Sequence, residues 1–587
     1  MLIYKKGEAM LEKLSPEKIK SYTQSQLNVL CDELRTTIYD TVMRCGGHLA
    51  SNLGSVESTV ALFYVFDFPN DKIVFDVGHQ CYPYKLLSGR YSRFDTLRQA
   101  GGISGFPKRT ESEYDAYDTG HAGTSVSAAI GLAKARDLKR ENRNVIAYIG
   151  DGSFNNGLVY EALNSLKILD TKILIILNDN GMSISPTVGG MYDIITQIKE
   201  NAAAENIRLL ESFGLTYLGV KNGNDLDEML LAMQEAKDLL QNGSVLLHIA
   251  TKKGKGYEFS EEHPTGTHGV PPVGSPKDKE YSEVLGETLC ALAKEDKAVT
   301  VVSAAMKEAL GLTDFFHDYP ERAFDVGICE ENASVLCASM AAGGLKPYYA
   351  IYSTFLQRAF DEIIHDVCAQ DMAVTFCIDR AGISGADGET HQGVFDLSYL
   401  SLIPNLTIAV PKDTEELRAM LQFSATYQHP LAIRYPRAGR VLFNGENPSI
   451  CVGKWEYLHK SEVKNGKKLA ILAAGERCLI IAMKILKNMQ EQGLDFDVIN
   501  ARFVKPLDMD YIQNTDATHI VTLEDNVAIG GFGQAVSMAF MQENKGCKVK
   551  NYAYRDQFIP QGGVAALQGE YGVNCKEIEE YVKSILV

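Results

Sequence analysis

The sequence has 587 residues, of which 45% are hydrophobic and 23% are charged, as in an ordinary globular protein. At about 150 residues per domain, this length predicts three or four domains. The formal charge of −17 argues against non-specific binding of the whole molecule to nucleic acid or anionic membranes. We also expect no membrane span and no secretory signal, because no apolar run approaches about 18 residues and the N-terminal stretch is charged throughout.

The cysteine pattern points to thiols rather than to a disulfide framework. There are twelve cysteines, with no CxxC pair and no spacing typical of a zinc site. We therefore expect buried thiols in a reducing cytoplasm. From composition, charge and cysteine pattern together, we predict that this is not a membrane, secreted, collagenous or disordered protein.

Strand-like apolar segments alternate with helix-length amphipathic segments along the chain, which predicts parallel α/β layers. In a first block, residues 144–150 and 172–177 are predicted strands that flank a helix near 158–169. A Pro/Gly-rich stretch at 251–278 follows, which we interpret partly as a linker. Further strands are predicted in a second block at 298–303, 347–351, 373–378, 406–410 and 431–435, and in a third at 469–475, 496–500 and 519–523.

The sharpest local signal is Gly150-Asp151-Gly152 followed by Asn178-Asp179-Asn180. Asp151 and Asn180 each follow a predicted strand, and ligands of parallel sheets bind beyond the carboxyl ends of strands. A carboxylate and an amide oxygen suit Mg²⁺, and Gly152 lets the backbone approach a phosphate. The alternative is a simple strand-end turn followed by a polar loop. The combined spacing favours a metal-diphosphate site.

This spacing resembles the thiamine diphosphate motif of transketolase-like enzymes. Such an enzyme also needs a carboxylate against the aminopyrimidine ring of the cofactor. Glu330 is a candidate, because an apolar strand is predicted to end at Cys329 and a helix of small residues follows. A carboxyl in a partly desolvated crevice gains the proton affinity that this role requires. A helix N-terminal Glu that favours the helix dipole is the alternative, and Glu331 fits that description better.

Longer stretches resemble one family, the 1-deoxy-D-xylulose-5-phosphate synthases. They include GGHLASNLGSVE, DVGHQCYPYKLLSGR, GISGFPKRTESEYD and DRAGISGADGETHQG, and they occur in the family's order over nearly all the chain. The matching residues are 46–57, 76–90, 102–115, 119–125, 352–367, 379–393, 434–437 and 530–533.

The resemblance implies a transketolase-like fold of three doubly wound α/β domains. These are a diphosphate- and Mg-binding domain at 1–277, a pyrimidine-binding domain at 278–445 and a transketolase C-terminal domain at 446–587. It implies decarboxylation of pyruvate and ligation to D-glyceraldehyde 3-phosphate, giving 1-deoxy-D-xylulose 5-phosphate and carbon dioxide for isoprenoid precursor and thiamine synthesis. The implied cofactors are thiamine diphosphate and Mg²⁺. We expect a cytoplasmic homodimer.

The resemblance also implies roles for individual residues. The implied catalytic residues are Glu330, His48, His391, His268 and Asp387. The implied cofactor contacts are His79, Gly120, His121, Ala122, Gly152, Ser153, Asn180, Tyr257, Glu330 and Phe355. The implied metal ligands are Asp151, Asn180 and the Met182 carbonyl, and the implied substrate contacts are Tyr352, Arg358, Arg380 and Arg437. Since Tyr257 lies within 251–278, part of that stretch is expected to be an active-site loop.

The sequence departs from the family pattern at Tyr84, Ala122-Gly123, Glu331-Asn332 and Lys307–Gly311, and the connection between Val188 and Phe213 is short. These departures are expected around the site and keep alternatives open. One alternative is the decarboxylating component of a 2-oxo acid dehydrogenase, which passes its acyl group to a lipoyl partner. A classical transketolase and a catalytically impaired paralogue are the others. The arginines argue against the lipoyl alternative, because a lipoyl acceptor carries no phosphate.

Overall fold

The computed structural model describes residues 10–201, 204–274, 280–439, 441, 449–462 and 468–587. By its contacts the chain divides into two compact units. Unit 1 comprises Met1–Pro276 and Gly327–Cys329, and unit 2 comprises Lys277–Val326 and Glu330–Val587. Within the described ranges, no helix combines the length and the apolar character needed to cross a membrane.

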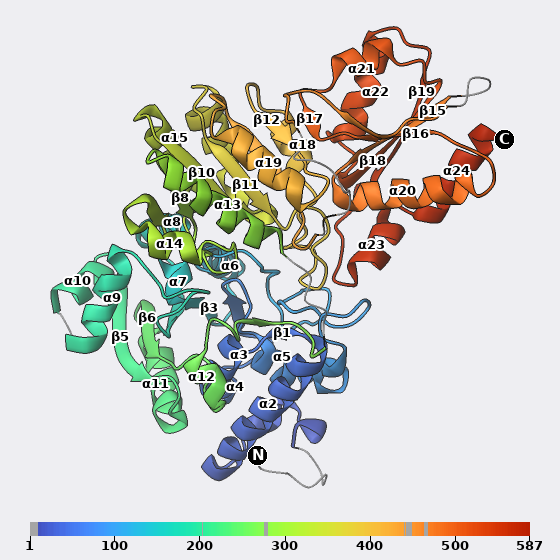
Figure 1. The fold of residues 1–587 in the computed structure, drawn as a ribbon. Helices are drawn as coiled ribbons and strands as arrows, with labels where there is room; N and C mark the ends of the chain where they lie inside the picture. The colour runs from blue at the N-terminus through green and yellow to red at the C-terminus, as the bar shows by residue number, and fades with distance from the viewer. Residues whose placement is uncertain (1–9, 202–203, 275–279, 440, 442–448, 463–467) are drawn as a thin grey trace. The chain divides into compact units, whose positions relative to one another are not determined.

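Unit 1 is built on a five-stranded parallel sheet with the order β2-β3-β4-β6-β5. Figure 1 labels β3, β5 and β6 of this sheet. Two of its strands and helix α8 (Gly157–Leu169) confirm the predicted βαβ unit. The strands are β2 (Lys72–Phe75), β3 (Val145–Gly150), β4 (Leu174–Asp179), β5 (Leu215–Asn222) and β6 (Ser244–Ala250).

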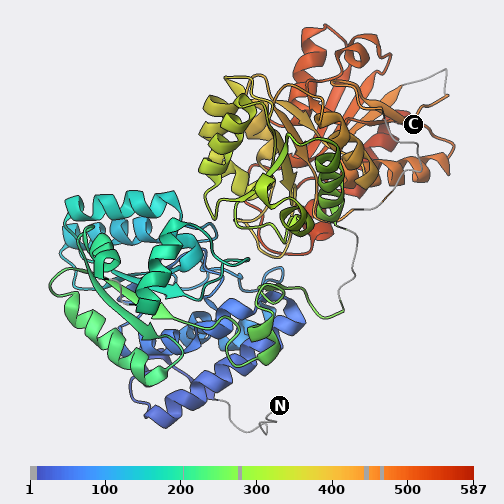
Figure 2. The same ribbon diagram turned by 60° about the vertical axis from the view of Figure 1, so that its left-hand side comes forward.

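Both faces of this sheet are buried. Successive side chains of a strand point to opposite faces, so one strand contributes to the core on each side. In β3, Ile146 and Tyr148 belong to one core cluster and Ala147 and Ile149 belong to the other. Figure 2 shows helices on the two sides of the sheet. The helices of the first cluster include α2 (Gln24–Cys45), α4 (Val56–Val65) and α11 (Leu226–Leu239), and those of the second include α6 (Ser125–Lys139) and α8.

A two-stranded antiparallel sheet joins segments of unit 1 that are far apart in the sequence. Strand β1 (Gly47–His48) pairs with β7 (Gly269–Val270), so that His48 lies opposite Gly269. The Pro/Gly-rich stretch therefore contributes β7 and helix α12 (Glu258–Glu262) to the fold. Residues 275–279 of the expected linker lie outside the described residues.

Unit 2 contains a seven-stranded sheet with the order β17-β12-β13-β11-β10-β8-β9. All neighbours are parallel except β17, which pairs antiparallel with β12. The five strands predicted in this region are confirmed. The sheet consists of β8 (Val299–Ser303), β9 (Ala323–Asp325), β10 (Lys346–Tyr352), β11 (Thr375–Asp379), β12 (Thr407–Ala409), β13 (Leu431–Arg434) and β17 (Phe503–Lys505).

The expectation of a strand that ends at Cys329 is wrong. Strand β9 ends at Asp325, and helix α15 (Glu330–Ala342) begins directly after Cys329. Gly327 has a φ of +71°, a left-handed conformation that interrupts an extended strand.

A second sheet of unit 2 has the order β14-β16-β15-β18-β19. It is parallel except for β14, and it packs with helices α20 (Glu476–Gln490) and α24 (Cys575–Leu586). With its helix-covered parallel sheets, the molecule has the predicted α/β class. The strands are β14 (Glu456–His459), β15 (Leu469–Ala474), β16 (Asp497–Asn500), β18 (His519–Val527) and β19 (Lys548–Tyr554).

All twelve cysteines lie within the described residues and are free thiols. Six of them are buried, but Cys451 is exposed, so the expectation of uniformly buried thiols is wrong. Cys451 lies in an irregular segment before β14, outside the sheet cores.

Candidate functional site

Asp151 and Asn180 lie together at the carboxyl ends of neighbouring strands, as their spacing predicts. Strands β3 and β4 pair with Gly150 opposite Asn178. The backbone N–H of Asn180 donates to Asp151 Oδ1 at 3.3 Å, and the Thr187 hydroxyl donates to Asp151 Oδ2 at 2.5 Å. Burial raises the pKa of the Asp151 carboxyl, and the nearby Asp179 raises it further. A cation beside Asp151 would offset this cost.

The turn after β4 brings further oxygens to this place. Asn180 Oδ1 accepts a hydrogen bond from Met182 N at 3.1 Å, and Gly181 has a φ of +76°. No group of three His, Cys, Asp or Glu side chains suited to a metal occurs among the described residues. A metal held by Asp151, Asn180 and Met182 would therefore need amide and backbone oxygens, which fit a hard cation such as Mg²⁺.

Gly152 is required here by a close approach to protein. A Cβ at Gly152 would lie 2.8 Å from Ser183 Cβ, in the segment that follows Met182. The adjacent Ser153 is buried and hydrogen-bonds to the Asp76 carboxylate. The sequence predicts that a side chain at position 152 would obstruct a phosphate. In the structure, Ser183 leaves no room for such a side chain.

Asp179, the middle residue of the Asn178–Asn180 motif, binds two side chains of other elements at the end of β4. Lys199 Nζ lies 2.8 Å and His248 Nε2 lies 3.1 Å from its Oδ2, and Tyr217 OH lies 2.8 Å from His248 Nδ1. Burial acts to raise the pKa of Asp179, but hydrogen bonds from His248 and Lys199 outweigh it and lower the pKa. Sequence reasoning missed this network, because its members come from four separate elements.

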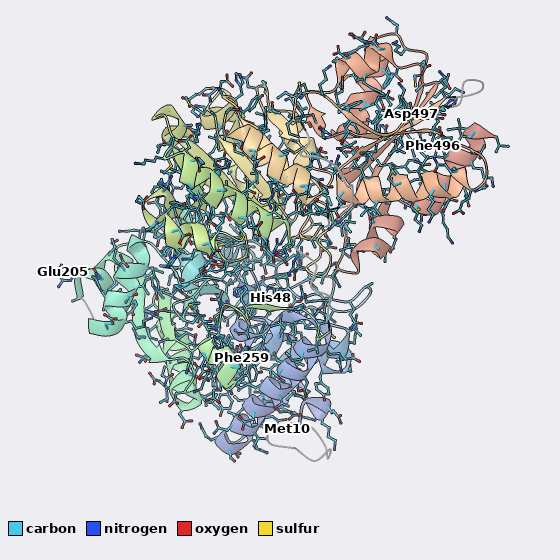
Figure 3. All side chains as sticks on the ribbon, in the orientation of Figure 1. Met10, His48, Glu205, Phe259, Phe496 and Asp497 are labelled. Atoms are coloured by element: carbon cyan, nitrogen blue, oxygen red, sulfur yellow. The ribbon has the colours of Figure 1, made fainter. Side chains whose placement is uncertain are left out.

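Three of the predicted histidines meet in unit 1. The ring centroids of His48, His79 and His268 lie 5.4–5.9 Å from one another, and Figure 3 marks His48 in this region. The β1–β7 pairing brings His268 to His48, and Asn52 Nδ2 donates to the carbonyls of His48 and His79 at 2.7 Å. Their proximity is an observation, whereas their chemical roles remain predictions.

The His268 imidazole is held in its neutral form. The residue is half-buried, and desolvation of its imidazole lowers its pKa well below the ordinary value, with the charges of Lys253 and the other two histidines adding to the effect. Burial also lowers the pKa of Lys253 to about 8, and its ammonium donates to the Ser183 carbonyl. Lys253 was missed at the sequence level, although it lies in the Lys-rich start of the 251–278 stretch.

The segment directly after the predicted turn Gly120-His121-Ala122 is held by a carboxylate that sequence reasoning did not identify. Asp76 accepts hydrogen bonds from Gly123 N at 2.8 Å and Ser125 N at 3.0 Å, at the start of α6. A Cβ at Gly123 would lie 2.4 Å from Asn156 Oδ1. Gly123, a departure from the family pattern, therefore fits a position without room for a side chain.

Two other residues singled out in unit 1 lie in different settings. Tyr257 is half-buried at the start of α12, with its hydroxyl 3.5 Å from Tyr39 OH. Tyr84 is fully buried, donates to the Tyr114 carbonyl at 2.9 Å, and packs against Phe63 and Phe75. The expectation that the departure at Tyr84 faces the site is wrong, because the phenol completes an aromatic core.

In unit 2, Glu330 is the first residue of α15 and is buried. Burial raises its pKa to about 7, against the opposing effect of Arg358, whose Nε lies 3.2 Å from Glu330 Oε2. Arg358, predicted to bind substrate, thus lies against Glu330, while Glu331 is more exposed and 3.9 Å from Arg358 Nη2. Glu330 has the burial and proton affinity expected of the pyrimidine-activating acid, and both roles remain predictions.

Several predicted residues of unit 2 form one aromatic stack. The Arg380 guanidinium lies 4.6 Å from the Tyr352 ring centroid. Tyr352 stacks on Phe355 at 5.8 Å, and Phe355 meets the edge of His391 at 5.7 Å. Asp387 is half-buried in the same loop as His391. The structure thus brings together side chains separated by up to 39 positions, from Tyr352 to His391.

The charges beside this stack are paired. Arg380 Nη1 lies 2.5 Å from Asp379 Oδ2, and its Nη2 lies 3.4 Å from Glu280 Oε2. Arg437 Nε lies 2.9 Å from Glu280 Oε1. Arg380 Nη2 also donates to the carbonyl of Ala309, in the altered loop Lys307–Gly311, at 3.5 Å. We refer to Glu280, Asp379, Arg380 and Arg437 as the arginine cluster.

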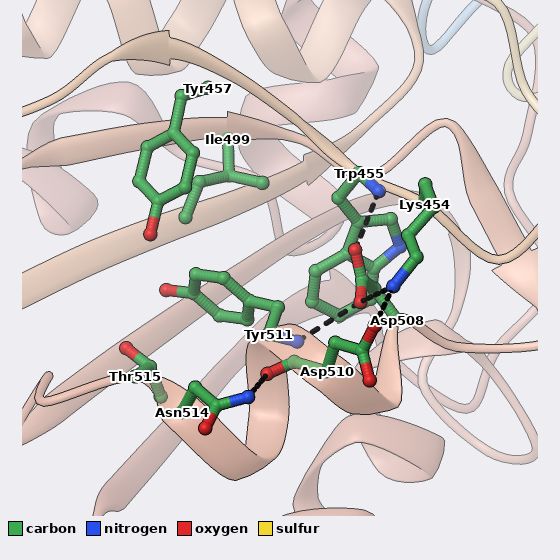
Figure 4. Close-up of a pocket in the computed structure, with 9 residues that line it drawn as sticks. All are labelled: Lys454, Trp455, Tyr457, Ile499, Asp508, Asp510, Tyr511, Asn514 and Thr515. Carbon is green, nitrogen blue, oxygen red and sulfur yellow. Dashed lines mark hydrogen bonds and ion pairs between the residues drawn. The ribbon is translucent and has the colours of Figure 1, made fainter. Parts of the chain in front are cut away.

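A pocket of about 280 Å³ lies elsewhere in unit 2 (Figure 4). Its Asp508 accepts hydrogen bonds from Trp455 N at 2.9 Å and Tyr511 N at 3.0 Å, which caps helix α21 (Met509–Asn514). Lys454 pairs with Asp508 at 3.6 Å. Its polar groups serve the local fold, and none of the predicted site residues lines it.

Comparisons with known proteins show which sequence families the chain matches. A sequence model described as 1-deoxy-D-xylulose-5-phosphate synthase matches residues 11–209. Models of the transketolase pyrimidine-binding domain and the transketolase C-terminal domain match residues 277–439 and 459–578.

Curated relatives match over nearly the whole chain. A 1-deoxy-D-xylulose-5-phosphate synthase of Clostridium botulinum (strain Alaska E43 / Type E3) is 43% identical, covering 98% of this chain and 99% of the relative. One of Clostridium tetani is 41% identical, covering 97% and 98%. A solved transketolase of Campylobacter jejuni covers 96% of this chain at 19% identity, with a TM-score of 0.44.

Proposed function

The chain belongs to the 1-deoxy-D-xylulose-5-phosphate synthase family, and from this premise we propose that it joins pyruvate, after decarboxylation, to D-glyceraldehyde 3-phosphate. The products are 1-deoxy-D-xylulose 5-phosphate and carbon dioxide. As a member of this family, the chain is a transketolase-like transferase. The observation that carries the proposal is the full-length match together with the retained Asp151, Asn180 and Glu330. We further propose a cytoplasmic homodimer that feeds isoprenoid and thiamine synthesis.

The proposed cofactors are thiamine diphosphate and Mg²⁺. Thiamine diphosphate supplies a nucleophilic carbon and an electron sink when bound. Asp151, Asn180 and the Met182 carbonyl would hold the metal ion. The buried Asp151 carboxyl, whose direct hydrogen-bond donors are the neutral Asn180 N–H and Thr187 hydroxyl, supports this assignment. His79, Tyr257 and the Gly120–Ala122 turn are proposed to contact the cofactor.

Glu330 is proposed to share a proton with the aminopyrimidine ring nitrogen. Its pKa of about 7 supports this role, since the carboxyl is protonated in a substantial fraction of molecules at neutral pH. His48, His268 and His391 are proposed to handle protons of the substrates, with Asp387 near His391. The neutral His268 would accept a proton or orient a substrate oxygen rather than bind an anion.

The test is a reaction with both substrates, thiamine diphosphate and Mg²⁺, beside a reaction with pyruvate alone. Carbon dioxide and the sugar phosphate are followed by mass spectrometry. Deoxyxylulose phosphate formed only with both substrates supports the proposal. Carbon dioxide without that product would point to another acceptor, such as a lipoyl group. Absence of both products from a protein that binds the cofactor would favour an impaired paralogue.

A further inference from the structure

The arginine cluster places the carboxylate of Glu280 beside Arg380 and Arg437, which the family resemblance implies as contacts of the phosphorylated substrate. Glu280 is the residue before helix α13 (Tyr281–Glu295), and its two carboxylate oxygens face Arg380 at 3.4 Å and Arg437 at 2.9 Å. A carboxylate that spans two guanidiniums occupies donors that would otherwise be available to a phosphate.

Backbone contacts hold the main chain of Glu280 beside the segment of Arg437. Tyr281 N donates to the Arg437 carbonyl at 3.1 Å, and Glu280 forms an isolated antiparallel bridge with Ala438. The position of Glu280 beside the arginines is therefore set by its main chain as well as by its side chain. The residue is anchored on the segment that carries Arg437.

The cluster is electrically balanced by its own residues. The positive charges of Arg380 and Arg437 meet the carboxylates of Asp379 and Glu280. Arg380 is nearly buried, with 12% of its side chain exposed, and is further held by Asp379 and the Ala309 carbonyl. Arg437 is 60% exposed, so its only ion pair in the described structure, to Glu280, is the one that a phosphate can displace.

We propose that Glu280 is a specificity-determining residue that competes with the acceptor phosphate for Arg437 and Arg380. This inference rests on the proposed function. Its consequence is that the enzyme discriminates weakly between a phosphorylated aldehyde and the same aldehyde without phosphate. Since Asp379 stays bound to Arg380, displacement of Glu280 leaves one net positive charge for the phosphate.

The test replaces the competing charge by Glu280→Gln, which keeps the size of the side chain. We expect the KM for D-glyceraldehyde 3-phosphate to fall about threefold to tenfold, with kcat within twofold of the wild type. The kcat/KM for unphosphorylated D-glyceraldehyde should not improve. Glu280→Ser removes the same charge with a residue that favours helix N-termini, and should act in the same direction. Glu280→Asp keeps the charge and should retain the selectivity of the wild type.

The matched control is Glu287→Gln, which removes the same charge from the exposed Arg418 pair of 3.0 Å between helices α13 and α19 (Thr414–Ser424). It should leave both KM values unchanged. A KM for the phosphorylated aldehyde that stays the same or rises in Glu280→Gln would overturn the proposal, because Glu280 would then orient the arginines.

A second measurement separates this inference from the proposed function. Inorganic phosphate is titrated into full-length wild type and Glu280→Gln by calorimetry, which requires no turnover. Tighter phosphate binding to the variant supports the competition even if no deoxyxylulose phosphate is formed. Equal binding contradicts the competition even in an active synthase.

Discussion

The turn at Asp151 and the arginine cluster hold their charges in opposite ways. Asp151 is a buried carboxylate whose direct hydrogen-bond donors are the neutral Asn180 N–H and Thr187 hydroxyl. In the arginine cluster, each guanidinium already faces a carboxylate of the same unit. A buried charge without a directly paired counter-charge is costly, and the nearby Lys253 offsets this cost at Asp151 only in part, because the pKa of the carboxyl stays raised. A paired charge is satisfied internally. The turn is thus prepared for a cation, while the cluster must give up a partner before it binds an anion.

Glu330 extends this comparison to catalysis, because it is buried like Asp151 but lies beside a guanidinium. Replacing Glu330 by Ala should reduce the rate of deoxyxylulose phosphate formation by about 10²- to 10⁴-fold, since it removes the proposed proton-sharing group. Binding of thiamine diphosphate with Mg²⁺, followed by calorimetry, should be largely retained. The control is Glu331→Ala at the neighbouring, more exposed position, where a much smaller effect is expected. Normal turnover in Glu330→Ala would remove this residue from the mechanism.

The second prediction breaks the turn itself. Asp151→Asn keeps the shape of the side chain but removes its charge, so affinity for thiamine diphosphate in the presence of Mg²⁺ should fall about 100-fold or more. Without cofactor, the variant should be at least as stable as the wild type near pH 7, because burial raises the pKa of the Asp151 carboxyl and its charged form is disfavoured. Cofactor titration and thermal unfolding measure the two effects.

The exposed Asp170→Asn, at the end of α8, removes the same charge and serves as the control for this pair of measurements. Unchanged cofactor affinity in Asp151→Asn would show that the metal is held elsewhere. A fall in both stability and affinity would instead indicate a structural role for the carboxylate.

Features that follow from neighbouring strands could be predicted from the sequence, whereas contacts between distant segments could not. Asp151 and Asn180 each follow a strand, and neighbouring parallel strands end at the same edge, so their proximity could be predicted from spacing. The meeting of His48 with His268 depends on the β1–β7 pair, in which each strand is two residues long and the paired residues are 221 and 223 positions apart. Such short strands carry no periodic signal. The Glu280 ion pairs likewise depend on tertiary contacts.

The neutral histidine offers a test of the buried environment in unit 1. The pKa of His268 lies well below the value of about 6.5 in an unfolded chain, so the unfolded state binds a proton first as the pH falls. The stabilisation is therefore complete above pH 6.5 and is lost as the pH falls from there toward the folded-state pKa. Urea unfolding between pH 8 and 5.5 should show this loss in the wild type and a shallower slope in His268→Gln.

His317→Gln is the control for this series, since the imidazole of His317 is exposed to solvent beside Asp318. Its low-pH slope should resemble that of the wild type more closely than that of His268→Gln. Equal slopes in the wild type and His268→Gln would mean that His268 takes up its proton in the folded protein as readily as in the unfolded chain.

The smallest expected effect concerns Tyr84, which departs from the family pattern yet lies in the aromatic core. Tyr84→Phe removes the hydrogen bond to the Tyr114 carbonyl and should reduce the free energy of unfolding by about 1 kcal/mol. Both KM values and kcat should stay within twofold of the wild type. Tyr117→Phe, at an exposed tyrosine, should change neither stability nor activity. A change in KM without a change in stability would show that Tyr84 influences substrate binding. Tyr84 could then no longer be separated, as a core residue, from the departure at Lys307–Gly311, which contacts Arg380.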